Sequence, residues 1–198
     1  VVWDLNIVGT QAVLEFWRKR KCKLVYAGSS TKFGDGGLAR DTSPYAWSKA
    51  VNTELVKNYS EWYTLPYAIT YFYNVFGPGE RAGAYGTLIA IFAEQYKKGQ
   101  PLTVVAPGTQ LRNFTHVSDI VDGLMLVGEK GEGDEHGLGH DKNFSVLEVS
   151  RLFGTDILML PVRQGNRMNS ALNTEKSRAL GWRAKVALED ELYTFLET

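Results

Sequence analysis

The sequence predicts an α/β fold built around a parallel β-sheet. Helical and strand-like segments alternate along the first part of the chain, which is typical of a parallel sheet. The strand-like segments are short, apolar and β-branched, as buried strands are. The composition agrees, because the 198 residues are 44% hydrophobic and 22% charged, as in one soluble globular domain with a sizeable core.

Four elements are expected in the first part of the chain. Apolar residues recur at helical spacing over residues 6–20, which predicts a helix. A buried strand is expected over 23–28 (KLVYAG), between a basic stretch and a Gly-Ser-Ser run. A second helix is expected over 44–62, because Pro44 is well tolerated in the first turn of a helix. Residues 67–72 (YAITYF) form another apolar strand.

The later part of the chain mixes shorter elements. Helices are expected over 87–98, 117–127, 145–153, 173–180 and 187–196, and strands over 102–105, 110–115 and 157–160. The Gly-rich and charged stretch 128–140 is expected to be a surface loop, because so many glycines and charges disfavour burial. A boundary is expected near residues 77–86, which divides the chain into segments 1–80 and 81–198.

The charge balance and cysteine count exclude several classes of function. Lys plus Arg and Asp plus Glu are 22 each, so the chain offers no basic footprint for nucleic acid or for an anionic membrane. The single Cys22 predicts neither an internal disulfide nor a metal site. No apolar run reaches the roughly 20 residues that cross a bilayer, and the first residues do not resemble a signal peptide. We therefore expect a cytoplasmic protein.

Three residues form a candidate catalytic group. Tyr45 and Lys49 are four positions apart on the second expected helix, so their side chains lie on one face. An ammonium beside a phenol favours the phenolate and makes the tyrosine a better general base. Ser29 lies at the end of the preceding strand and could bind the same substrate oxygen. Such a group can take a proton from a carbinol while hydride leaves for a nicotinamide, although Tyr-x-x-x-Lys also occurs by chance on exposed helices.

The sequence resembles the extended short-chain dehydrogenase/reductase family, and within it the NAD-dependent nucleotide-sugar epimerases and dehydratases of the UDP-glucose 4-epimerase type. Segments in the order of the family carry the resemblance and span nearly the whole chain. They are NIVGTQAVLEF (6–16), YAGSSTKFG (26–34), SPYAWSKA (43–50), YFYNVFGPGER (71–81), LRNFTHVSDIVDG (111–123), SVLEV (145–149) and TEKSRALGW (174–182). The resemblance implies a partial Rossmann-type, doubly wound sheet followed by a small C-terminal α+β lobe.

The resemblance also implies roles for individual residues. Tyr45 matches the catalytic base, Lys49 the lysine that lowers its pKa and holds the nicotinamide ribose, and Ser29 the active hydroxyl. NAD is the implied cofactor, with NADP left open, and a UDP-sugar is the implied substrate. Further cofactor contacts are expected from Asn6, Phe72 and Tyr73, and contacts to the substrate diphosphate from Asn74, Arg112 and Arg163. Arginine suits a diphosphate because its guanidinium binds oxyanions with two donors.

Departures from the family pattern reduce the number of activities that we expect. Ser29 is followed by Ser30-Thr31-Lys32, whereas the family's dehydratases and decarboxylases carry acidic residues there. Asn113 replaces the family's aspartate after the arginine. We therefore expect an epimerase that oxidises a sugar hydroxyl, usually at C4, and returns the hydride to the opposite face. A ketoreductase or dehydratase of the same family and a non-catalytic fragment stay open as alternatives.

The resemblance begins midway through the family's dinucleotide-binding domain. Segment 1–80 corresponds to the second half of that domain and segment 81–198 to the substrate-binding lobe, and no G-x-G-x-x-G turn opens the chain. This predicts impaired activity for the 198-residue chain. It also predicts that the strand over 23–28 has an open apolar edge and that the protein self-associates as a homo-oligomer, expected to be a dimer, that covers the edge.

Overall fold

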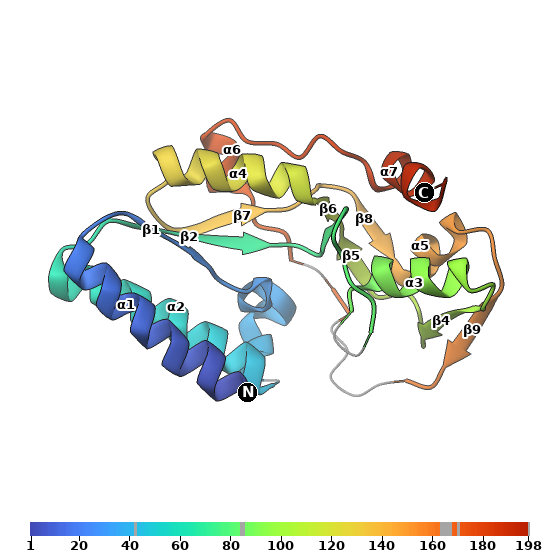
Figure 1. Ribbon diagram of the computed structural model, residues 1–198, viewed down its shortest axis with the longest axis horizontal. Coiled ribbons are helices and arrows are strands. Elements are labelled where there is room, and N and C mark those ends of the chain that lie inside the picture. The colour runs from blue at the N-terminus through green and yellow to red at the C-terminus, as the bar shows by residue number, and fades with distance from the viewer. Residues whose placement is uncertain (42, 84–85, 163–167, 170, 198) are drawn as a thin grey trace.

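The computed structural model describes residues 1–41, 43–83, 86–162, 168–169 and 171–197 (Figure 1). A three-stranded parallel sheet in the order β1-β2-β7 organises one end of the molecule. Its strands are β1 (Leu24–Ala27), β2 (Tyr67–Phe72) and β7 (Gly133–Leu138). Helices α1 (Gly9–Arg20) and α2 (Pro44–Tyr63) lie on one face and α4 (Val117–Lys130) on the other (Figure 1). This is the doubly wound arrangement that the sequence predicts.

The helices over the first face are set by their termini and their apolar side chains. Ser43 caps α2, because its hydroxyl accepts the Ala46 N–H at 3.1 Å, and Pro44 occupies the first turn. A π-helical turn, η1 (Trp3–Val8), leads into α1. Leu14 and Trp17 of α1 pack with Val56 of α2 beneath the sheet, which fixes both helices against it. A 3₁₀ segment, η2 (Ser30–Asp41), connects β1 to α2.

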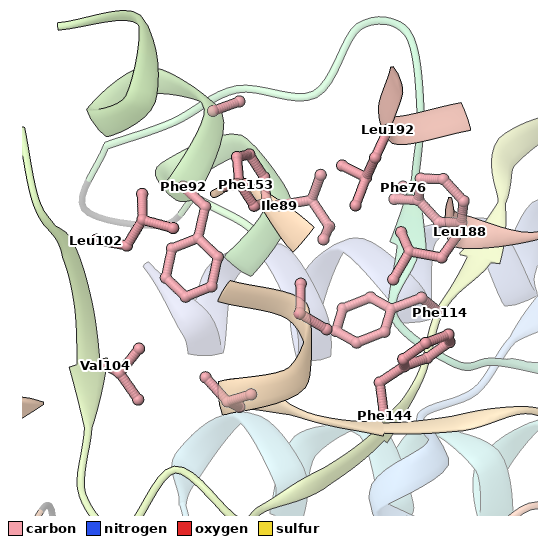
Figure 2. Packing of buried hydrophobic residues seen from close by; sticks show 13 residues of the cluster. Phe76, Ile89, Phe92, Leu102, Val104, Phe114, Phe144, Phe153, Leu188 and Leu192 are labelled. Atoms are coloured by element: carbon pink, nitrogen blue, oxygen red, sulfur yellow. The ribbon is translucent and has the colours of Figure 1, made fainter. Parts of the chain in front are cut away.

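The other end of the molecule is a smaller mixed lobe. Its elements are α3 (Leu88–Lys97), α5 (Val146–Leu152), the parallel pair β4 (Leu102–Val105) and β9 (Ile157–Leu160), and the antiparallel pair β5 (Leu111–Asn113) and β8 (Asn143–Ser145). Phenylalanines dominate its core, and Figure 2 shows Phe92 and Phe153 packed together, with ring centroids 5.8 Å apart. Leu188 and Leu192 of α7 (Leu188–Glu197) close this core.

Short elements link the two ends. β3 (Val75–Phe76) pairs in parallel with β6 (Thr115–His116), which leads directly into α4. The sequence predicts one strand over 110–115, whereas the structure divides it between β5 and β6. Helix α6 (Glu175–Ala179) contacts β7. None of the helices in the described ranges is both long and apolar enough to cross a membrane.

The prediction of a surface loop over 128–140 is wrong. Helix α4 continues to Lys130, and Gly133–Leu138 form β7, which pairs with β2 inside the sheet. The glycines permit this burial, because a Cβ at Gly137 would lie 1.7 Å from the Asn173 carbonyl oxygen. The charge of Asp134 is neutralised by lysines from other elements. Close packing and ion pairing, which act over long sequence distances, therefore overcome the local polarity of this stretch.

Candidate active site

Ser29 and Lys49 meet at the carboxyl end of β1. Ser29 follows this strand after Gly28, and its Oγ accepts the hydroxyl of Thr31 at 2.9 Å. The Lys49 ammonium donates to the Ala27 carbonyl at 2.6 Å and to the Tyr26 hydroxyl at 3.2 Å. Both side chains line one cavity. The structure thus brings together two of the three residues that the sequence analysis selects.

Tyr45 lies one turn before Lys49 in the first turn of α2. Its side chain is 49% exposed, so the phenol is accessible to a ligand. Tyr45 is not among the described residues that line the cavity shared by Ser29 and Lys49. The structure therefore agrees with the expected order of the three residues along β1 and α2, and their catalytic roles stay a prediction.

Asn6 connects η1 to α2. Its side-chain amide donates to the Ser48 hydroxyl at 2.9 Å, and its backbone carbonyl accepts the Asn52 amide at 2.7 Å. Asn52 is fully buried and also donates to the Thr10 hydroxyl at 3.1 Å. These contacts hold the start of the chain against the helix that carries Tyr45 and Lys49.

Phe72 and Tyr73 end strand β2 with different surroundings. Phe72 is half-buried and packs with Leu138 and Trp182 on the α4 side of the sheet. Tyr73 is fully buried, and its hydroxyl donates to the Ala171 carbonyl at 3.1 Å and accepts the Asn173 N–H at the same distance. The described contacts of both residues are thus with the protein's own core, and their expected place beside a nicotinamide stays a prediction.

Asn74 and Arg112 line a second cavity, in the smaller lobe. Asn74 adopts a left-handed backbone conformation (φ 39°), and its amide donates to the Asn113 carbonyl at 2.9 Å. The cavity measures about 300 Å³, and its apolar walls come from Leu88, Ile91, Phe92, Phe114, Val146 and Leu160. An apolar pocket with a few polar groups is the usual form of a ligand site. Arg163, the third residue assigned to the diphosphate, lies outside the described residues.

A cluster of hydrogen-bonded and charged side chains around Asp134 is not predicted by the sequence. Asp134 accepts the Tyr71 hydroxyl and the Lys32 ammonium, both at 2.6 Å, and forms an ion pair with Lys57. Burial opposes its ionisation, but these hydrogen bonds outweigh burial and lower the pKa of Asp134 to about 2. Burial and the neighbouring carboxylate raise the pKa of Tyr71 far above its usual value of 10.0. Tyr71, Lys32 and Lys57 are far apart in sequence from Asp134, so no local pattern reveals the cluster.

The fold and this group of residues define a class of protein. A parallel sheet with helices on both faces, a serine after one strand and a Tyr-x-x-x-Lys sequence opening the next helix are the features of a short-chain dehydrogenase/reductase. The family model of the NAD dependent epimerase/dehydratase family matches residues 1–140. The chain belongs to this family, and the resemblance expected from its motifs is confirmed.

Similar proteins agree with this assignment. The chain is 28% identical to a putative UDP-glucose 4-epimerase of Methanocaldococcus jannaschii, over 94% of this chain and 66% of that protein. It is also 28% identical to the dTDP-D-glucose 4,6-dehydratase of Bos taurus, over 87% of this chain and 52% of that protein. The structure of Thermus thermophilus UDP-glucose 4-epimerase in complex with NAD superposes with a TM-score of 0.87 at 26% identity, covering 98% of this chain and 70% of that one. The chain therefore spans about half to two thirds of the length of these curated relatives.

The residues at the end of β1 fit the ribose of a nicotinamide cofactor. An ammonium has three donors, and Lys49 uses two of them on Ala27 and Tyr26. Both acceptors are neutral oxygens, so a ribose hydroxyl could replace either one without leaving a buried carboxylate unpaired.

Proposed function

We propose that the protein acts as an NAD-dependent nucleotide-sugar epimerase and that its substrate is a UDP-sugar. The observation that carries the proposal is the convergence of Ser29 and Lys49 at the end of β1, with the accessible phenol of Tyr45 one turn before Lys49. The M. jannaschii relative is described as a putative UDP-glucose 4-epimerase and the T. thermophilus structure as a UDP-glucose 4-epimerase, which supports the choice of reaction and of substrate.

The chemistry follows from these side chains. Tyr45 acts as the general base that takes the proton of the sugar C4 hydroxyl, and the Ser29 hydroxyl binds the same oxygen. Lys49 would hold the cofactor ribose. NAD, when bound, would supply a hydride acceptor for C4 and a hydride donor to the opposite face of the ketosugar. Tyr45 then returns the proton to the oxygen, so the cycle consumes no net cofactor.

The second cavity is our candidate for the nucleotide end of the substrate. Its apolar walls suit a base, and Arg112 and Asn74 suit the diphosphate. Firm binding there would leave the sugar free to rotate, which epimerisation requires because hydride must reach both faces of C4. Arg112 precedes Asn113 on β5, and the Asn113 carbonyl accepts the Asn74 amide at 2.9 Å, so the two expected diphosphate contacts lie on adjoining segments.

A dehydratase or ketoreductase of the same family is the second candidate. The similarity to the B. taurus dehydratase supports a dehydratase, whereas the sequence Ser30-Thr31-Lys32 offers no acid after Ser29 to expel water. The reactions are separable, because a ketoreductase consumes reduced cofactor, a dehydratase releases water from the sugar, and an epimerase does neither.

The proposal is tested by binding and turnover of UDP-glucose with NAD. We expect saturable calorimetric binding of UDP-glucose by the 198-residue chain. Conversion to UDP-galactose on chromatography when NAD is present should be slow, because the sequence predicts impaired activity. Tyr45→Phe should abolish conversion and leave binding of UDP-glucose unchanged. Arg112→Gln should weaken binding about tenfold or more, because it removes a charge-assisted hydrogen bond. Conversion that persists in Tyr45→Phe, or the absence of any saturable binding, would contradict the proposal.

A further inference from the structure

We propose that the cavity between η2 and α2 is a binding site for a small oxyanion of the phosphate type, separate from the cavity at Asn74 and Arg112. It measures about 220 Å³. Four cationic side chains line it, and they are Lys32, Arg40, Lys49 and Lys57. Ligand pockets for drug-sized molecules begin at about 300 Å³, so this cavity suits a phosphate group and not a whole sugar nucleotide.

Among the described residues that line the cavity, cationic side chains outnumber carboxylates. Lys32 and Lys57 both pair with a single carboxylate oxygen of Asp134. Glu135 lies 3.5 Å from Lys32 but is 45% exposed, so solvent screens its contribution. The described partners of Lys49 are the neutral oxygens of Ala27 and Tyr26. Two neighbouring acidic residues therefore face three lysines, and an anion in the cavity would relieve the repulsion among the ammonium groups.

The arginine of the cavity is held by surface pairs. Arg40 lies 2.9 Å from Glu54 and 3.7 Å from Asp41, and the three side chains are 43%, 53% and 76% exposed. Such exposed pairs contribute little, so the guanidinium can turn to an incoming oxyanion, which it binds with two parallel donors. Among the described residues that line the cavity, Glu54 is the one carboxylate. It is therefore the group that opposes an anion.

A hydroxyl supplies a further donor. Ser29 Oγ acts as the acceptor in both of its described hydrogen bonds, from the N–H and the hydroxyl of Thr31. Its own proton can point into the cavity. The site thus combines ammonium, guanidinium and hydroxyl donors from η2 and α2 around one space. Because Ser29 and Lys49 belong to it, an anion bound there would contact the proposed catalytic group from the η2 side.

Inorganic phosphate is the probe that tests the site. The protein is titrated with phosphate by calorimetry at constant ionic strength, without NAD or sugar nucleotide, so the result does not depend on the proposed epimerase reaction. We expect saturable binding by the unmodified chain. Arg40→Gln and Lys57→Gln should each weaken it about tenfold or more, the effect of losing one charge-assisted hydrogen bond. Glu54→Gln should tighten it, a gain that partial unfolding cannot produce.

Two arginine variants locate the bound phosphate. Arg18→Gln is the matched control for Arg40→Gln, because Arg18 is also about two-fifths exposed and paired with a nearby glutamate, Glu15, but lies on α1. It should leave phosphate affinity unchanged. Arg112→Gln tests the other cavity and should also leave it unchanged. The proposal is overturned if phosphate does not bind saturably, if Glu54→Gln weakens binding, or if affinity falls in Arg112→Gln and not in Lys57→Gln.

Discussion

Asp134 is 11% exposed in its side chain and lies between two lysine ammoniums and a tyrosine hydroxyl. Because these partners lower its pKa from 3.8 to about 2, the folded state holds this proton less tightly than the unfolded state does. The carboxylate therefore stabilises the protein fully above pH 4, and this contribution is lost as the pH falls towards 2. The shift corresponds to about 2 kcal/mol.

We expect Asp134→Asn to lower the free energy of unfolding by about 2 kcal/mol or more at pH 7, because Lys32 and Lys57 then lose their shared carboxylate. The difference from the unmodified protein should shrink between pH 4 and pH 2. Urea denaturation at several pH values measures it. Asp122→Asn is the control, because Asp122 is 63% exposed and should show little effect. A difference for Asp134→Asn that is constant with pH would contradict the assigned pKa shift.

Helix α4 contains two glycines, Gly123 and Gly128, whose surroundings are packed to different degrees. At Gly123 an added Cβ would lie 2.6 Å from Leu138 Cδ2 and 2.8 Å from Trp182 Nε1. Trp182 cannot move freely, because its indole donates to the Asp119 carbonyl at 2.9 Å. At Gly128 the nearest atom, Val25 Cγ2, lies 3.8 Å away, which is ordinary contact. One glycine is thus required by packing and the other is not.

We expect opposite effects from the same substitution in this helix. Gly123→Ala should destabilise the protein by roughly 1–3 kcal/mol through overpacking. Gly128→Ala should stabilise it by roughly 0.5–1 kcal/mol, because alanine loses less backbone entropy in a helix. Thermal unfolding followed by circular dichroism measures both. Equal destabilisation by the two variants would show that α4 does not pack on β7 and Trp182 as described.

At the scale of the whole molecule, the edge of β1 that faces away from β2 affects whether the protein self-associates. Leu24 and Gly28 donate their N–H groups to the Pro66 and Thr70 carbonyls on the β2 side. Alternate residues of a strand present their backbone groups to opposite sides, so Ala27 faces the edge away from β2. Its carbonyl accepts the Lys49 ammonium there. The backbone N–H groups on this edge, that of Ala27 included, can pair with another chain.

We expect the protein to self-associate at micromolar concentration, which light scattering coupled to size exclusion would detect as a mass above 22.1 kDa. Ala27→Pro should reduce the association, because it removes an edge N–H at an exposed position. Circular dichroism would check that this variant keeps its fold. A single-chain mass for the unmodified protein under these conditions would contradict the prediction.

The residues of the site can be predicted from the sequence only where they lie close together along the chain. Tyr45 and Lys49 share a helix, and Ser29 follows an apolar strand, so spacing and motif were enough to select them. The division into segments 1–80 and 81–198, by contrast, stays a prediction. Asp134, Lys32, Lys57 and Tyr71 come together from four elements, and no periodicity connects them.

Local sequence is enough to assign the family, the α/β class and most helices and strands, because hydrophobic periodicity, helix caps and local motifs act over a few residues. That residues 133–138 form a buried strand, and that cations from η2 and α2 surround one cavity, is evident from the folded chain alone. The physical reason is the same in both cases. Close backbone approach at Gly137 and the pairing of Asp134 with distant lysines are contacts between segments far apart in the chain, and their energies appear only once the chain has folded.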